Sequence, residues 1–197
     1  ILLCTVFNPA KSEVTILQNT DDEKCFDENT KLVNVGIGWG KNYYYGSIGS
    51  KIAVSSPSFC LSYEQPWPKR IGPGFLGVGG YLGYRHSNYN NTSNGYYFES
   101  YWNYIMVTGR AAYHWDVLNS KKAEVYAGHL VGLRAHLNRL ETTDSGTNTT
   151  NSSNDNEILP VFSVFAGARW YFTRNIAVYG EAGSGISYLT GGITFRF

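Results

Sequence analysis

His86 and Ser87 are adjacent, and their side-chain types fit nucleophilic chemistry. A histidine within hydrogen-bond reach of a serine can remove the hydroxyl proton and activate the oxygen for attack on an ester. The pair stands where a predicted strand enters the polar stretch SNYNNTSNGYYF. A polar strand end is the simpler interpretation, so His86 and Ser87 are candidates for testing rather than an assigned catalytic site.

Charged residues on the polar faces of predicted strands form a second candidate group. These residues are Glu64, Arg85, Arg110, Arg169 and Glu181. Isolated charges in a narrow space of low dielectric are costly, so carboxylates and guanidinium groups that face one another should pair. We therefore predict that these residues form a structural charge network inside the fold.

Metal, cofactor and nucleic-acid sites are not indicated. His114, His129 and His136 lack a metal-binding spacing, and the three cysteines include no CxxC pair. The glycines of GIGWG and GVGG do not open a helix, as a phosphate-binding loop would require. The 16 basic and 15 acidic residues give a net charge of +1, which does not suggest a nucleic-acid partner. We expect no cofactor and no metal.

The composition of the 197 residues favours strands and tight turns, because it includes 22 Gly, 16 Tyr, 10 Phe and 5 Trp. No run of about 18 apolar residues exists, which excludes a transmembrane helix. Strands that alternate apolar and polar residues can still form a membrane barrel without any such run.

Eight segments alternate in this way, most clearly the last, where Leu189, Ile193 and Phe195 share one face. The predicted strands are about 32–40, 58–64, 75–86, 101–115, 124–136, 161–172, 176–183 and 188–197. The fifth is ambiguous because both of its faces are mixed, and we favour an inward Arg134.

The predicted connections differ in length in a regular way. Residues 41–57, 87–100 and 137–160 form long connections, 65–74 is intermediate, and 116–123, 173–175 and 184–187 are short. Long loops at one end and short turns with both termini at the other are typical of an up-and-down membrane barrel. The polar stretch TDSGTNTTNSSNDN, residues 143–156, is predicted to be a mobile outer loop.

The faces opposite the apolar ones are rich in glycine and carry the charged candidates, so they suit a narrow lumen better than a water-exposed surface. A closed barrel satisfies every backbone group, which allows an alternating chain to enter lipid. We predict an all-β, eight-stranded antiparallel up-and-down transmembrane β-barrel over residues 30–197. Its interior should be filled by side chains.

Three segments carry a family resemblance. The terminal GISYLTGGITFRF, ending in Phe197, resembles the closing strand of bacterial outer-membrane β-barrel proteins. ARWYFTRNIAVYGEAG and GVGGYLGYR are similar to the outer-membrane β-barrel domain common in Bacteroidetes. The resemblance implies an outer-membrane location with extracellular long loops and periplasmic termini. It also implies contact with outer-membrane lipid and lipopolysaccharide, and recognition of Phe197 by the barrel-assembly machinery.

Residues 1–29 fall outside this resemblance. The apolar start, Ile1 to Phe7, followed by Ala10-Lys11-Ser12, indicates either a signal remnant or a periplasmic segment. Lipidation of Cys4 and the pairing of the cysteines stay open at this point.

The resembled family is functionally heterogeneous, so several functions stay open. We favour a non-enzymatic outer-membrane barrel that serves envelope integrity or partner binding, either alone or as an accessory subunit of a larger outer-membrane complex. The alternative is a lipid-modifying hydrolase like the lipid A deacylases, with His86 and Ser87 as the test residues. That family places one residue between its His and Ser, later in the chain, so this sequence departs from it twice. A weaker alternative is a narrow channel past Arg85, Arg110 and Arg169.

Overall fold

We describe a computed structural model of the chain, which covers residues 25–40, 54–93, 96–115, 120, 122–144, 146–147 and 149–197. Within these residues there are nine strands. They are β1 (Leu32–Trp39), β2 (Val54–Ser55), β3 (Ser58–Pro66), β4 (Gly74–Ser93), β5 (Tyr96–Trp115), β6 (Ala123–Asp144), β7 (Thr149–Tyr171), β8 (Ile176–Gly183) and β9 (Leu189–Arg196).

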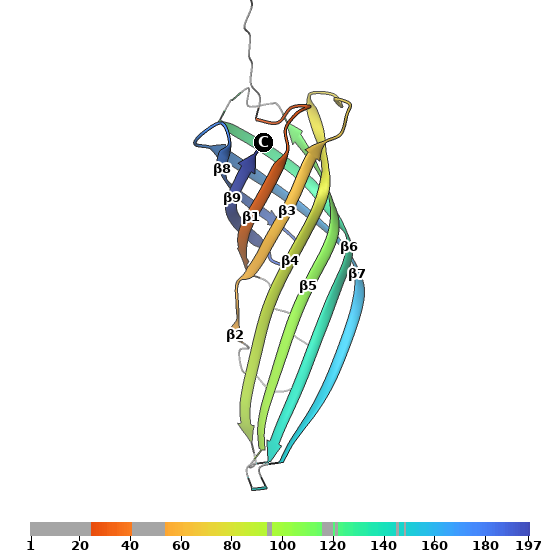
Figure 1. The fold of residues 1–197 in the computed structure, drawn as a ribbon, viewed down its shortest axis with the longest axis vertical. Coiled ribbons are helices and arrows are strands. Elements are labelled where there is room, and N and C mark those ends of the chain that lie inside the picture. The colour runs from red at the N-terminus through yellow and green to blue at the C-terminus, as the bar shows by residue number, and fades with distance from the viewer. Residues whose placement is uncertain are drawn as a thin grey trace, which may run out of the picture.

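Eight of these strands close into a ring, shown in Figure 1. Neighbours in the ring are β1, β3, β4, β5, β6, β7, β8 and β9 in that order, and every pairing is antiparallel. Antiparallel pairing of β1 with β9, from Leu32↔Arg196 to Trp39↔Leu189, closes the ring. The short β2 pairs with β4 outside it. The predicted eight-stranded up-and-down barrel is confirmed.

The outer wall of the barrel is apolar and the inner wall is polar. A row of residues in register across five strands, Val35, Leu61, Leu82, Val107 and Leu133, is 45–58% exposed. The alternate residues of the same strands point inward and are mostly small, polar or charged. This pattern is the reverse of a soluble barrel and suits a wall that faces lipid.

Large aromatic side chains lie on the outer wall near both ends of the barrel. Trp39 and Phe59 are more than half exposed at the end nearest the long hairpins, and Trp170 is 51% exposed at the other. Such rings at both margins of an apolar band are typical of the aromatic girdles of membrane barrels.

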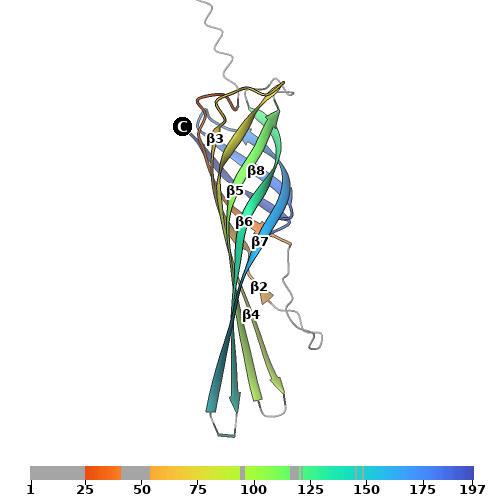
Figure 2. The ribbon, with the colours of Figure 1, turned by 90° about the vertical axis from the view of Figure 1, so that its right-hand side faces the viewer.

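Strands β4 to β7 continue well beyond the closed barrel, as Figures 1 and 2 show. The pairing runs without interruption to Ser93↔Tyr96 in one hairpin and to Asp144↔Thr149 in the next. We call residues 85–93, 96–104, 136–144 and 149–157 the protruding sheet. The predicted long loops 87–100 and 137–160 are therefore wrong, because most of their residues are in strands.

The predicted mobile loop at residues 143–156 is also wrong in its described part, since residues 149–156 belong to β7 and pair with β6. The physical reason is that backbone pairing needs no apolar side chains. Where both faces of a sheet meet water, the apolar alternation that marks a strand in the sequence disappears.

The ends of the barrel follow the predicted arrangement in the described residues. The short connections 172–175 and 67–73 lie at the same end as the C-terminus (Figure 1), while the two hairpin tips lie at the opposite end. Residues 41–53 of the predicted first long loop lie outside the described residues.

No helix among the described residues is long and apolar enough to cross a bilayer.

Candidate functional site: a charge network across the barrel lumen

Arg110, on the inner face of β5, lies between two carboxylates inside the barrel. Its Nε donates to Glu64 Oε2 at 2.7 Å, and its Nη2 donates to Glu181 Oε1 at 2.6 Å. The guanidinium carbon also lies 4.0 Å from the centroid of the Phe165 ring. The Tyr126 hydroxyl donates to the same Glu181 oxygen at 3.0 Å. Arg110 thus joins β3, β5 and β8 across the lumen.

Arg169, on the inner face of β7, forms a second centre toward the short-turn end. Its Nη1 donates to Glu124, and its Nε donates to Thr194 Oγ1 at 3.0 Å. The Thr194 hydroxyl donates to Asn34 Oδ1 at 2.7 Å, and Arg169 Nη2 reaches the same oxygen at 3.3 Å. This centre connects β1, β6, β7 and β9.

His114 on β5 joins the two centres. Its Nε2 is 2.7 Å from Glu64 Oε1, and its Nδ1 is 3.0 Å from Glu124 Oε1. The Nδ1 contact is a hydrogen bond to the Glu124 carboxylate, whereas the Nε2 contact is a close approach to Glu64 that becomes an ion pair when the ring is protonated. A protonated His114 with Arg110 and Arg169 would balance the three carboxylates of Glu64, Glu124 and Glu181.

Glycines facing the lumen make room for this network. A Cβ at Gly36 would lie 2.2 Å from the Tyr179 hydroxyl, and one at Gly167 would lie 2.8 Å from both Glu181 Cγ and the Tyr126 hydroxyl. Larger residues at these positions would displace the groups that surround the ion pairs. The glycine-rich inner face noted in the sequence is therefore the space that the network occupies.

The segment before β1 packs into the short-turn end of the barrel. The Phe26 ring stacks on His114 with 3.8 Å between centroids and 10° between planes. The backbone oxygen of Cys25 accepts a hydrogen bond from the Tyr171 hydroxyl at 3.3 Å. Residues 25–29, the end of the segment predicted to precede the barrel, thus contact the inner wall.

The predicted network residues divide into two groups in space. Arg110 contacts both Glu64 and Glu181, and Arg169 is joined to them through Glu124 and His114. Arg85 is also buried and on the inner face, but it lies six residues along β4 from the register partner of Arg110. At about 3.3 Å per residue, it stands about 20 Å nearer the hairpin tips.

Sequence reasoning missed Glu124, Asn34 and the central position of His114. A signal for Glu124 was available, because residues 124 and 134 lie on the same face of β6 and Arg134 was expected to face inward. The structure places Glu124, Tyr126 and Leu130 inward and buried, so Arg134 falls on the inner face as predicted. Alternation also places His114 on the face of Arg110, but its role could not be predicted, because that role depends on which strands meet across the lumen.

His86 and Ser87 point to opposite faces of β4. The Ser87 side chain is buried on the inner face, whereas His86 Nδ1 lies 2.9 Å from Asn103 Oδ1 on β5. Successive side chains of a strand alternate between faces, so the imidazole is not directed at the neighbouring hydroxyl. The structure does not assemble the nucleophile and base that a serine hydrolase needs.

No group of three or more His, Cys, Asp or Glu side chains in the described part of the chain is placed to hold a metal ion. Cys60 is a buried free thiol, and Cys25 is also buried, with its Sγ donating to the Ser120 backbone oxygen at 3.2 Å. Cys4 lies outside the described residues.

Comparisons with known proteins give structural likeness only. No family model and no curated protein matches the chain. Among solved structures, it is similar to the attachment invasion locus protein Ail of Yersinia pestis, with 13% identity and a TM-score of 0.44, over 87% of this chain and 100% of that one. It is also similar to Neisserial surface protein A, with 15% identity and a TM-score of 0.36, over 85% and 95% of the two chains. The N-terminal β-barrel domain of Pseudomonas aeruginosa OprF gives 14% identity and a TM-score of 0.37, over 86% and 98%. The fold stands on the strand pairing described above.

Proposed function

We propose that the protein is a non-enzymatic outer-membrane barrel that is closed by side chains and holds the protruding sheet outside the cell for partner binding. The observation that carries this proposal is the contrast between the two parts of the molecule. The closed barrel is apolar outside, with the ion pairs of Arg110 and Arg169 buried inside it. The protruding sheet consists of paired strands outside that barrel; its β7 part has polar side chains on both faces, and its β5 part carries the exposed Tyr96 and Tyr97.

Closure by the charge network argues against a channel. The side chains of Arg110 and Glu64 are at most 1% exposed, and the network contains residues from β1, β3, β5, β6, β7, β8 and β9. An ion crossing the barrel would have to break several buried ion pairs, each costly to separate. Purified protein in planar bilayers should therefore give no steady conductance, and regular conducting steps would refute closure.

The orientation follows from the shape and the wall. Long hairpins on one side of an apolar band and short turns on the other are the arrangement of outer-membrane barrels, with the hairpins extracellular and the termini periplasmic. We extend this to assembly: the apolar wall contacts outer-membrane lipid and lipopolysaccharide, and the exposed terminal Phe197 is a recognition signal for the barrel-assembly machinery. The Bacteroidetes-type relationship belongs to the same proposal.

Partner binding is favoured over a purely mechanical role in envelope integrity because a barrel needs no protruding sheet to span lipid. Along β7, residues 149–164 pair with β6 on one side, whereas pairing with β8 begins only at Phe165. An accessory subunit of a larger outer-membrane complex would use this sheet as its contact.

A pull-down in gentle detergent tests the proposal. The comparison variant lacks residues 89–100 and 141–152, each replaced by a two-residue turn, so that the closed barrel keeps its pairing. We expect co-purifying proteins with the full chain and their loss with the shortened one. Retention by the shortened chain, or no specific protein with either, would contradict binding through the sheet. Slower gel migration after heating verifies that both forms are folded.

A further inference from the structure

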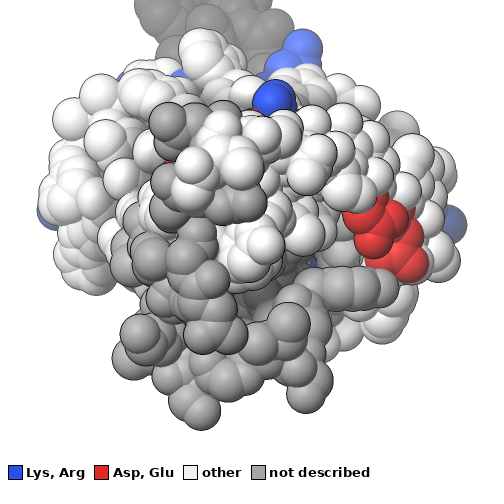
Figure 3. Space-filling model, turned by 90° about the horizontal axis from the view of Figure 1, so that it is seen from below, with Lys and Arg blue, Asp and Glu red and all other residues white. Residues whose placement is uncertain are grey.

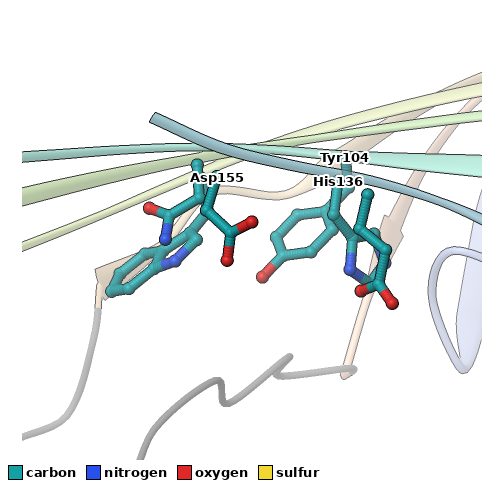
Figure 4. A pocket seen from close by; sticks show the side chains of 6 residues that line it. Tyr104, His136 and Asp155 are labelled. Atoms are coloured by element: carbon teal, nitrogen blue, oxygen red, sulfur yellow. The ribbon is translucent and has the colours of Figure 1, made fainter. Parts of the chain in front are cut away.

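A small open pocket lies on the protruding sheet, on the face that continues the barrel lumen. Its lining residues are Trp102 and Tyr104 from β5, His136 and Asn138 from β6, and Asp155 and Glu157 from β7. Figure 4 shows Tyr104, His136 and Asp155 projecting from the same face of the strands. The pocket is separate from the charge network and was not assigned a role above.

Strand pairing places the six residues in two adjacent rows. Trp102, Asn138 and Asp155 are register partners across β5, β6 and β7. Tyr104, His136 and Glu157 form the next row on the same face, with the Tyr104 and His136 rings edge to face at 4.8 Å. Direct cross-strand neighbours have Cβ atoms about 5 Å apart, so these side chains form one compact, rigidly held surface.

Two polar atoms of this surface are buried without a hydrogen-bond partner. These are Trp102 Nε1, which can only donate, and Asn138 Oδ1, which can only accept. Leaving such atoms unpaired costs free energy, and buried polar groups in folded proteins are normally paired with protein or water. A donor and an acceptor in the same row therefore indicate a partner that offers both an acceptor and a donor, as a hydroxyl group does.

The charges of the pocket exclude strongly charged ligands. Asp155 and Glu157 are acceptors when ionised and would repel an anion. On the surface seen from the hairpin tips, Figure 3 shows a group of acidic side chains at one side. A cation is disfavoured by the Trp102 N–H and by Arg134, which lies two residues before His136 on the same face of β6. Burial and then the charge of Arg134 lower the pKa of His136, so the imidazole is neutral at pH 7.

We infer that this pocket binds a sugar ring of a neutral saccharide. The half-buried Trp102 ring offers a flat apolar surface with a polar edge, to which the apolar face of a pyranose can pack. The Tyr104 ring is buried and forms part of the pocket wall. The Asp155 and Glu157 carboxylates and the Asn138 amide accept and donate hydrogen bonds around its hydroxyls. The pocket is a shallow hollow open to solvent, so it would contact one face or edge of a sugar ring without enclosing the ring.

The inference rests on the proposed function in one respect, because the pocket meets glycans from outside only if the hairpins are extracellular. The binding itself does not depend on that orientation. Neutral sugars could come from the oligosaccharide of the cell's own lipopolysaccharide or from soluble glycans of the surroundings, and the chemistry of recognition is the same.

Binding of defined sugars to purified, detergent-folded protein tests the inference. The probes are neutral oligosaccharides of glucose, galactose, mannose and N-acetylglucosamine, the delipidated lipopolysaccharide oligosaccharide, and a sulfated oligosaccharide, each titrated by calorimetry. We expect at least one neutral probe to bind and the sulfated probe to bind more weakly. A stronger response to the delipidated oligosaccharide would identify the cell's own envelope as the source, and a stronger response to the soluble sugars would identify an external one.

Variants decide whether the pocket is the site. Asp155→Ala removes a carboxylate, and Trp102→Phe removes the indole N–H group together with part of the ring surface, so each should weaken binding about tenfold. Asn154→Ala is the matched control, because Asn154 neighbours Asp155 but lies on the opposite face of β7. The inference would be overturned if no neutral sugar bound with a dissociation constant below about 10 mM. It would also be overturned if the sulfated probe bound more tightly, or if Asp155→Ala and Asn154→Ala bound equally well. If sugar binding is intact but the full chain retains no specific protein in the pull-down, or the shortened chain retains the same proteins, the proposed function alone is refuted.

Discussion

Replacing Arg110 with alanine should destabilise the barrel strongly. The change removes the cation between Glu64, whose side chain is 0% exposed, and Glu181, whose side chain is 11% exposed. Both carboxylates would stay in the lumen without their main partner. Removing one member of a buried ion pair costs about 3–5 kcal/mol, and we expect the free energy of unfolding to fall by about that amount. The contact with the Phe165 ring is lost as well.

The measurement is reversible urea unfolding in lipid vesicles, followed by tryptophan fluorescence and by gel mobility without heating. Arg139→Ala is the matched control, because Arg139 pairs with Glu141 at 2.8 Å but its side chain is 60% exposed. An exposed pair contributes about 0–1 kcal/mol, so this variant should unfold almost as the unaltered protein does.

A triple variant separates the loss of packing from the loss of charge balance. Glu64→Gln, Arg110→Met and Glu181→Gln together leave no unpaired carboxylate at this centre, and replacement of a buried ion pair by neutral groups is often nearly neutral. We expect the triple variant to be more stable than Arg110→Ala. A cost below about 1 kcal/mol for Arg110→Ala, equal to that of Arg139→Ala, would refute the view that buried charge balance holds the lumen together.

Three further changes test other parts of the account. Gly192→Ala should prevent stable folding, because the added Cβ would lie 2.1 Å from the Val35 backbone oxygen. Gly180→Ala should fold normally, because its Cβ would have nothing within 4 Å. Gel mobility distinguishes folded from unfolded protein, and equal folding of the two variants would contradict the close inner packing. Val107→Arg on the outer wall should lower stability in lipid by about 2–4 kcal/mol, measured by urea titration, and an unchanged midpoint would mean that this row does not face lipid. Phe197→Ala should lower the amount assembled in outer membranes, measured by fractionation, while leaving detergent refolding intact; normal assembly would exclude Phe197 as the signal.

The closed barrel could be predicted from the sequence because its two faces meet different surroundings. On strands such as β1 and β9, apolar residues face outward while glycine and polar residues face inward, so the period of two is visible. The protruding part of β7, with the sequence TTNSSNDNE, has polar residues on both faces. Its strand character comes from backbone pairing alone, and alternation could not reveal it.

The charge network could be predicted only in part for a related reason. Alternation places Glu64, Arg110 and Glu181 on the inner face, but it does not say which of them meet. Contacts such as that between Arg169 on β7 and Asn34 on β1 depend on the closure of the ring and on the stagger between strands. The sugar pocket was hidden for both reasons, since its residues lie in a segment that alternation does not mark.

The most direct test of the membrane barrel is the surroundings of spin labels attached at two positions. Val107→Cys and Ser152→Cys are each made in a chain whose native cysteines are replaced by serine, then labelled and folded into lipid vesicles. Val107 is 58% exposed on the outer wall of β5, and Ser152 is exposed near the tip of β7. Oxygen concentrates in lipid, so the account predicts that oxygen relaxes the label at 107 more than a water-soluble nickel complex does. At 152 the nickel complex should relax the label more than oxygen does. A label at 107 that is more accessible to nickel than to oxygen would contradict the account.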